Sequence, residues 1–141
     1  MKKQWMFAVM AVSVLLLGVG CQQQGRPKKA TSAAGLKSVH FDFDRADIKA
    51  ESKTILEGNA DWIKKHKSGD VTVEGNCDER GTEEYNIALG HRRASATKSY
   101  LVSLGVEAAH LSVKSYGEEK PAATCHNESC WWQNPRADFK K

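Results

Sequence analysis

One stretch of the chain decides its fold: VTVEGNCDERGTEEYNIALGHRRA, residues 71–94. Residues 71–75 alternate between apolar and polar or small side chains, which is typical of a strand with one buried face. Gly81 and Thr82 interrupt that pattern and precede a long helix, which we predict over residues 83–104. The stretch therefore predicts a strand, a charged loop and a helix in immediate succession.

The loop of this stretch carries more charge than a turn requires. Asp78, Glu79 and Arg80 follow the strand, and Arg93 lies roughly two to three turns into the helix, whose first turn favours anions. If the loop folds back over the helix, the Asp78 carboxylate and the Arg93 guanidinium face one cleft. A ligand with an ammonium and a carboxylate on one carbon would match both groups. An internal Asp78–Arg93 salt bridge is the alternative that the residues alone leave open.

A shorter strand and a helix precede this stretch. Residues 39–43 alternate apolar with polar side chains and predict a half-buried strand. Residues 50–67 are predicted as a helix, with Asp47 as a candidate cap. The apolar positions of this helix recur at helical spacing and are Ile55, Leu56, Ala60 and Ile63.

Two strands complete the predicted domain. The long helix ends at Gly105, since glycine readily adopts the conformation that stops a helix. Residues 111–116 alternate as a third strand, and residues 136–140 are predicted as a fourth, edge strand after Pro135, which lacks an N–H for a sheet ladder. The order β-α-β-α-β-β predicts an α+β two-layer sandwich, with helices on one face of a mixed sheet. The expected apolar stripe of the long helix is Ile87, Gly90, Ala94, Thr97, Leu101 and Leu104.

The front of the chain has the composition of an export signal. Two lysines precede an apolar run of 14 residues at 6–19, which is shorter than the about 20 residues that span a bilayer. Residues 1–20 are therefore predicted as a signal peptide. Small residues before Cys21 resemble a bacterial lipobox, in which that cysteine is acylated, although Gly18 stands where leucine is usual. A plain secretory signal cut near Gly20 is the alternative.

A polar, basic segment of low complexity follows Cys21. Residues 21–35 are predicted as the lipidated cysteine and a flexible tether, because they contain no aliphatic side chain larger than alanine. Fully extended, such a tether reaches roughly 50 Å. The folded domain is predicted over residues 36–141. It holds 16 of the 21 basic residues against all 17 acidic ones, and this near-neutral balance argues against a nucleic-acid binder.

Three cysteines lie in the predicted domain. Cys125 and Cys130 enclose four residues, a spacing that permits a small disulfide loop in an oxidising compartment, with Cys77 left over. Free thiols and a metal site with His126 are the alternatives. We expect no metal, because the spacing lacks the tight paired turns of a structural zinc site.

Three motifs carry a resemblance to a known family: FDFDRADI at 41–48, the stretch at 73–94, and SYGEEKPA at 115–122. Together they closely resemble the OmpA C-terminal-like family over nearly the whole predicted domain. The resemblance implies non-catalytic binding of the peptidoglycan stem peptide through meso-diaminopimelate, with no cofactor. It further implies a lipid-anchored protein of the outer membrane with its domain in the periplasm, and a role with TolB and other Tol proteins in envelope integrity and division.

The resemblance also assigns roles to individual residues. Asp78 falls on the family aspartate that meets the diaminopimelate ammonium, and Arg93 on the arginine that meets its carboxylate. Phe41 and Asp42 fall in a loop whose backbone amides face the ligand, and Asn86 supports the pocket. We expect alanine at 78 or 93 to abolish wall binding without unfolding the domain. Glu79 and Arg80 either orient Asp78 or form a solvated salt bridge.

An enzyme that acts on the cell wall is the rival hypothesis. Asp42, Asp44, Asp78 and Glu79 would supply carboxylates, with Cys77 or His91 as a nucleophile and a base. No spacing among them predicts a nucleophile, a base and an orienting group, which such catalysis requires. Trp131 and Trp132 are expected to close an edge of the core, with an exposed partner surface as the alternative.

Overall fold

The computed structural model describes residues 35–66 and 69–141. The predicted signal peptide, Cys21 and residues 22–34 of the predicted tether lie outside the described residues, so these boundaries remain predictions. In the part of the chain that is described, no helix is both long and apolar enough to cross a membrane.

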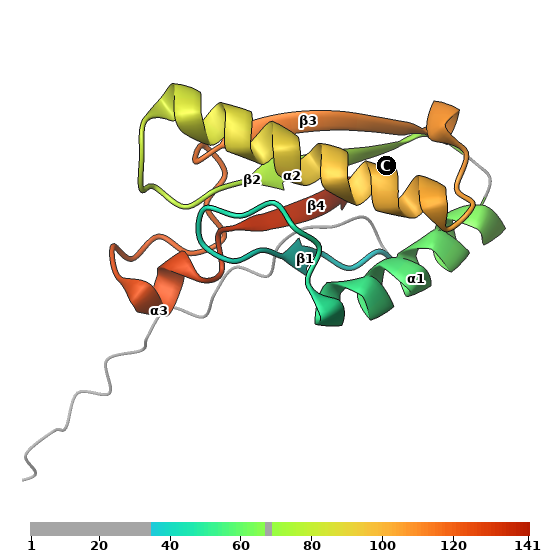
Figure 1. Ribbon diagram of the computed structural model, residues 1–141, viewed down its shortest axis with the longest axis horizontal. Helices are drawn as coiled ribbons and strands as arrows, with labels where there is room; N and C mark the ends of the chain where they lie inside the picture. The colour runs from blue at the N-terminus through green and yellow to red at the C-terminus, as the bar shows by residue number, and fades with distance from the viewer. Residues whose placement is uncertain (1–34, 67–68) are drawn as a thin grey trace, which may run out of the picture.

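The domain is a four-stranded mixed sheet with two long helices on one face (Figure 1). The strands lie in the order β1-β4-β2-β3, in which β2 and β3 are parallel and β4 is antiparallel to both β1 and β2. This arrangement confirms the predicted α+β class. The elements are β1 (Val39–His40), α1 (Ala50–Lys65), β2 (Val71–Asn76), α2 (Glu83–Ser103), the 3-10 turn η1 (Ala108–His110), β3 (Leu111–Gly117), α3 (Glu128–Trp131) and β4 (Arg136–Lys140).

The last strand is not at the edge of the sheet, and that prediction was wrong. β4 lies between β1 and β2, and its residues Arg136 to Phe139 are buried. Pro135 is compatible with this position because it precedes the strand and contributes only its carbonyl, which accepts from the Phe41 N–H at 2.8 Å. The two buried charged side chains of β4 are paired: the Arg136 guanidinium lies 2.9 Å from Asp138.

The buried face of α2 differs from the predicted stripe at its first turns. Gly90, Ala94, Thr97 and Leu101 are buried as expected, whereas Ile87 is 37% exposed. Buried side chains that the pattern missed are Asn86, Leu89 and Arg93. Helix α2 begins after Thr82, whose hydroxyl accepts from the Tyr85 N–H at 3.2 Å, and it ends before Gly105, which has a positive φ of 88° as predicted.

The first strand and helix are shorter than predicted. β1 spans two residues, because the chain turns away into a loop after Phe41. Helix α1 is capped by Lys49 without a side-chain bond, whereas the predicted cap Asp47 instead pairs with Arg45 at 2.6 Å. Asn59 on α1 is buried and bonds both backbone groups of Lys37, which fixes the chain that leads into β1.

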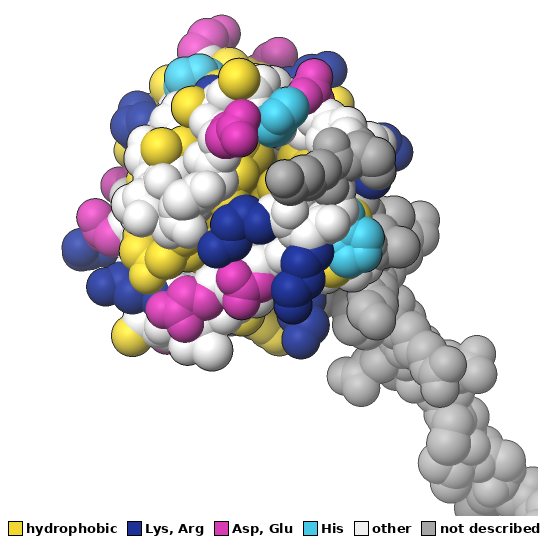
Figure 2. Space-filling model, turned by 90° about the vertical axis from the view of Figure 1, so that its right-hand side faces the viewer, with side chains coloured by type: hydrophobic (Ala, Val, Ile, Leu, Met, Phe, Trp, Pro, Cys, Tyr) yellow, Lys and Arg dark blue, Asp and Glu magenta, His cyan; other side chains and the backbone are white. Residues whose placement is uncertain are grey.

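Charges of both signs are interspersed at the end of the domain where α1 and α2 terminate. Figure 2 shows that lysine and arginine alternate there with aspartate and glutamate around small apolar areas. That face therefore lacks the continuous basic surface that a nucleic-acid binder requires.

Helix α2 packs closely on β2 through two glycines. A Cβ atom on Gly75 would collide with the backbone carbonyl of Gly90, and a Cβ on Gly90 would lie 2.9 Å from the backbone carbonyl oxygen of Gly75 as well as against the Ser115 hydroxyl. Backbone cannot give way as the tip of a flexible side chain can, so the contact requires glycine at both positions. This close approach sets the distance between the strand before the charged loop and the helix after it.

Replacing Gly75 by alanine is expected to lower the free energy of unfolding by about 2–3 kcal/mol, because α2 must shift away from the sheet. Gly58 supplies a matched control, since a Cβ there meets no atom within 4 Å. Gly58→Ala should instead stabilise the domain by about 0.5–1 kcal/mol through helix propensity. Urea unfolding of both variants measures the difference, and equal stabilities would contradict this account of the packing.

Candidate functional site

The loop between β2 and α2 holds Asp78 by a contact within the loop. Asp78 is 4% exposed, and its carboxylate accepts from Arg80 at three places. The bonds are Nε to Oδ1 at 3.0 Å, Nη2 to Oδ2 at 2.8 Å and the backbone N–H to Oδ1 at 3.0 Å. This bidentate hydrogen bond raises the pKa of Arg80. Arg80 is therefore the internal partner of Asp78, in place of the Asp78–Arg93 salt bridge considered from the sequence.

Arg93 lies at the centre of three chain segments. It is 1% exposed, and its guanidinium donates to backbone carbonyls from the loop after β1 and from the end of β2. The bonds are Nε to Arg45 O at 2.8 Å, Nη1 to Asn76 O at 2.9 Å and Nη2 to Asp42 O at 3.1 Å, and Nη1 also contacts Cys77 Sγ at 3.3 Å. Burial lowers the pKa of Arg93, although an arginine stays charged at neutral pH. One Nη2 hydrogen makes no bond to the described residues.

Asp78 and Arg93 line the same cavity. This first cavity has a volume of about 180 Å³ and opens between the β2–α2 loop, the start of α2 and the loop after β1. Its mouth includes Phe43 and Tyr85, whose hydroxyl bonds Asp44. The structure thus brings together the two charges that the sequence analysis paired. Lining residues that it missed as site residues are Phe43, Tyr85, Gly81 and Leu89.

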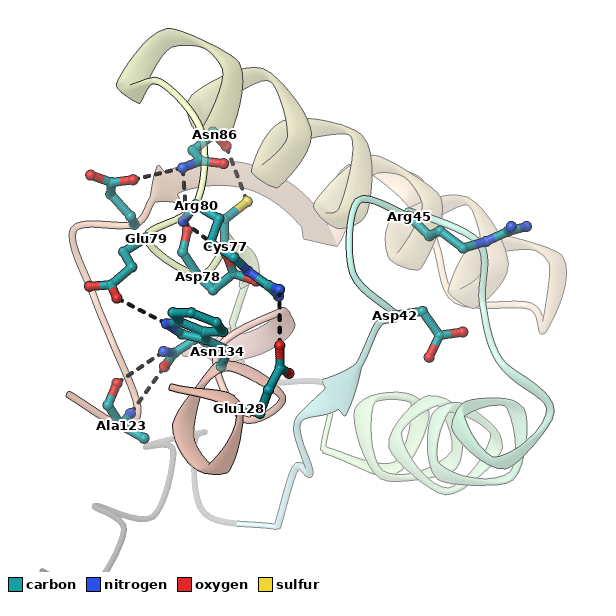
Figure 3. A network of polar contacts seen from close by, with 12 residues as sticks. Asp42, Arg45, Cys77, Asp78, Glu79, Arg80, Asn86, Ala123, Glu128 and Asn134 are labelled. Carbon is teal, nitrogen blue, oxygen red and sulfur yellow. Dashed lines mark hydrogen bonds and ion pairs between the residues drawn. The ribbon is translucent and has the colours of Figure 1, made fainter. Parts of the chain in front are cut away.

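Asn86 and Cys77 brace the floor of the first cavity. The Asn86 amide donates to the Asp78 carbonyl at 3.2 Å and to the Glu118 carboxylate at 2.7 Å, which ties the loop to the end of β3 (Figure 3). The Cys77 thiol donates to the Asn86 carbonyl at 3.3 Å, and burial raises the pKa of this thiol. Both residues therefore fix the conformation of the β2–α2 loop at the floor of the first cavity.

The loop after β1 contributes differently from what the resemblance implied. The Phe41 amide already donates to the Pro135 carbonyl, so it is not available to a ligand. The Asp42 carbonyl accepts from Arg93, and the Asp42 carboxylate pairs with Lys49 at 2.9 Å. The side chains of Phe41 and Asp42 line a second, neighbouring cavity and not the first.

The segment around α3 covers the charged loop from the other side. The structure joins Cys125 and Cys130 by a disulfide and leaves Cys77 as a buried free thiol. Glu79 accepts from the Trp131 indole at 2.9 Å and contacts His126 at 2.6 Å, and the two contacts lower the pKa of Glu79. Arg80 lies 3.6 Å from Glu128, which points towards it from α3 (Figure 3).

The two tryptophans do not close an edge of the core, and that expectation was wrong. Trp131 is half-buried under the Arg80 guanidinium, 4.6 Å from its ring centre, and Trp132 is 62% exposed. The reason is that the α3 segment packs against the charged loop and not over the core: Trp131 donates to Glu79, and the Trp132 ring lies 6.2 Å from the His40 ring.

The residues of the rival enzymatic hypothesis do not assemble into catalytic machinery. The His91 ring contacts Ser95 on its own helix, and the Cys77 thiol faces Asn86 and Arg93 without a base beside it. Residues 35–66 and 69–141 contain no cluster of three or more histidine, cysteine or acidic side chains that could hold a metal ion. The arrangement is suited to binding small opposite charges.

Comparisons with known proteins give the relatives of this chain. The model of the OmpA family matches residues 40–130. A peptidoglycan-associated lipoprotein of Rhizobium meliloti is 46% identical over 86% of this chain and 68% of its own length. One from Haemophilus influenzae is 51% identical over 71% of this chain and 65% of its own.

Solved structures show the same fold. The crystal structure of the peptidoglycan-associated lipoprotein from Burkholderia pseudomallei is 44% identical, with a TM-score of 0.70 over 73% of this chain and 87% of that one. The C-terminal domain of Helicobacter pylori MotB is 24% identical, with a TM-score of 0.67 over 75% of this chain and 84% of that one, and shares the fold alone.

Proposed function

The chain belongs to the OmpA family and is a relative of the peptidoglycan-associated lipoproteins, and from this premise we propose that it anchors a membrane to the cell wall by binding peptidoglycan without catalysis. The observation that carries the proposal is the first cavity, in which the buried Asp78 carboxylate and the buried Arg93 guanidinium line the same small space. No covalent step is needed for an anchor, since charge-assisted hydrogen bonds hold a zwitterion.

We propose that the ligand in this cavity is the diaminopimelate of the stem peptide, whose free end carries an ammonium and a carboxylate on one carbon. The ammonium is bound by Asp78 and the carboxylate by Arg93. Binding requires the Arg80 guanidinium to release Asp78, because Arg80 donates three bonds to this buried carboxylate and neutralises the charge that the ligand ammonium needs. A second acceptor is close, since Glu128 lies 3.6 Å from Arg80 and Trp131 lies beneath it. Arg80 thus moves between two acidic partners as the ligand enters.

The burial of Arg93 fits a role as a fixed anchor. Its bonds to three carbonyls hold the guanidinium rigid, so that little conformational entropy is lost when a carboxylate arrives. The carbonyls are neutral. Among the described residues, no carboxylate bonds directly to the Arg93 guanidinium, so its positive charge is not paired. An anion that reaches the remaining N–H therefore gains a charge-assisted bond in a site of low solvent exposure.

The membrane side of the proposal rests on the front of the chain. An acylated Cys21 would hold the protein in the outer membrane, and residues 22–35 would span the distance to a periplasmic domain, roughly 50 Å at most. Several acyl chains are required for stable anchoring, since one chain binds a bilayer only reversibly. TolB and other Tol proteins are the proposed partners in envelope integrity and division, on the strength of the family resemblance.

The proposal is tested with isolated cell-wall sacculi and two stem peptides. The full chain, purified in detergent, is expected to sediment with sacculi and to release no fragments from them. A peptide whose diaminopimelate amine is cross-linked should bind about 30-fold more weakly than the free form, because an amide cannot supply the ammonium that Asp78 requires. Isothermal titration calorimetry measures both affinities. Release of wall fragments, or equal affinity for the two peptides, would refute the proposed binding mode.

A further inference from the structure

A second and larger cavity adjoins the first. It has a volume of about 590 Å³, within the usual range for sites that enclose a small ligand. Phe43 and Arg80 line both cavities, so the two share a wall. A ligand that extends beyond Asp78 and Arg93 can therefore continue past Phe43 into the second cavity. None of the residues assigned above to the diaminopimelate charges requires this second space.

Aromatic rings form much of its lining. Phe43 is 56% exposed and Trp132 is 62% exposed, and both are large apolar side chains that contact solvent. The His40 ring lies 6.2 Å from the Trp132 ring, and burial lowers the pKa of His40, so an uncharged flat ring adds to the wall. Exposed aromatic rings that cluster in one cavity are typical of a binding surface.

Carboxylates occupy the rim of the same hollow. Asp42 and Glu51 share Lys49, at 2.9 Å and 3.0 Å, and Glu128 reaches in from α3 with its side chain 80% exposed. A carboxylate oxygen has several lone pairs, so each of these groups keeps acceptor capacity beyond its salt bridge. The cavity therefore combines flat apolar rings with acceptors, and this combination suits a ligand that has an apolar face and many O–H donors.

We propose that the second cavity binds a sugar ring of the glycan strand to which the stem peptide is attached. This inference rests on the proposed function of the first cavity. A pyranose ring carries C–H groups on its faces, which stack on aromatic rings, and hydroxyl groups at its edge, which donate to carboxylates. Diaminopimelate is the third residue of the stem, so the two preceding residues span about 7–10 Å between the sugar and the first cavity. The shared wall of Phe43 and Arg80 gives that link a direct path.

The test compares two soluble ligands: a stem peptide with free diaminopimelate, and the same peptide carrying its N-acetylated disaccharide. The wild-type chain is expected to bind the disaccharide form about tenfold more tightly, because stacking on one aromatic ring raises the affinity by about that factor. Trp132→Ala should remove this gain and leave the affinity for the bare peptide unchanged, since Trp132 does not line the first cavity. Trp132→Phe, which keeps a ring, should retain part of the gain.

Val102→Ala is the matched control, because Val102 is an exposed apolar side chain that lines neither cavity. It should leave both affinities at their wild-type values. Equal affinity of the wild type for the two ligands, or a Trp132→Ala variant that keeps the gain, overturns the inference and assigns the rings to another partner, such as a protein. A Trp132→Ala variant that weakens both ligands equally overturns it too. Failure of the wild type to bind either ligand would instead overturn the proposed function itself.

Discussion

Asp78→Asn is expected to weaken binding of the free stem peptide about 100-fold, because it removes the carboxylate that binds the ligand ammonium in the proposed mode. Asparagine keeps the shape of the side chain, and its amide oxygen still accepts from the Arg80 backbone. The domain should therefore stay folded, with an unchanged far-ultraviolet circular dichroism spectrum. Isothermal titration calorimetry measures the affinity, and sedimentation with sacculi should be lost in parallel.

Two controls make the Asp78 result specific. Glu84→Gln removes one negative charge from the exposed first turn of α2, close to the cavity but outside its lining, and should change the affinity less than about threefold. The cross-linked peptide should bind wild type and Asp78→Asn almost equally, since neither complex contains an ammonium–carboxylate pair. If Asp78→Asn bound the free peptide as tightly as Glu84→Gln does, the ammonium would have another partner.

Arg93→Ala is expected to abolish binding and to destabilise the domain by about 3 kcal/mol or more. From the sequence alone we expected no effect on the fold, whereas the buried bonds of Arg93 lead us to expect a loss of stability as well. Arg93 satisfies the carbonyls of Arg45, Asn76 and Asp42, and each buried carbonyl left without a donor costs about 1–3 kcal/mol. Urea unfolding measures the loss as a lower midpoint, and binding must be compared at a temperature where both proteins are folded.

Arg92 provides the control for Arg93. It has the same side chain one position earlier on α2, but it is exposed, and its guanidinium lies 5.7 Å from the centre of the Tyr85 ring. Arg92→Ala should change the stability by no more than about 0.5 kcal/mol. A variant at 93 that unfolds at the same urea concentration as the variant at 92 would show that the three carbonyls find other donors, and that Arg93 serves the ligand alone.

Several features could be read from the sequence because they depend on local patterns. The alternation at 71–75 and the break at Gly81 and Thr82 predict the strand, loop and helix that the structure contains. The end of α2 at Gly105 was predictable because it depends only on the backbone conformation of that residue. The meeting of Asp78 and Arg93 was also predictable in outline, since a loop between adjacent elements has few ways to return to the helix that follows it.

The errors share one physical cause, which is that they depend on contacts between segments far apart in the chain. An alternating pattern at 136–140 indicates that one face of the strand is buried, but it does not indicate which strands are its neighbours. In the structure, β4 lies between β1 and β2. A helical stripe marks apolar positions, but it could not show that the polar Arg93 would be buried by carbonyls from two other segments.

The sequence by itself determined the class of the fold, the charged loop and the approach of Asp78 to Arg93 in the middle of α2, since each follows from the order of neighbouring elements. Only the tertiary structure decided that Arg80 holds Asp78, that α3 and Trp131 lie against that loop, and that a second cavity opens beside the first. The position of α3 and the second cavity arise where residues about 50 positions apart meet, as Glu79 and Trp131 do at 2.9 Å. Such contacts are fixed by the packing of the whole domain, on which local periodicity carries no information.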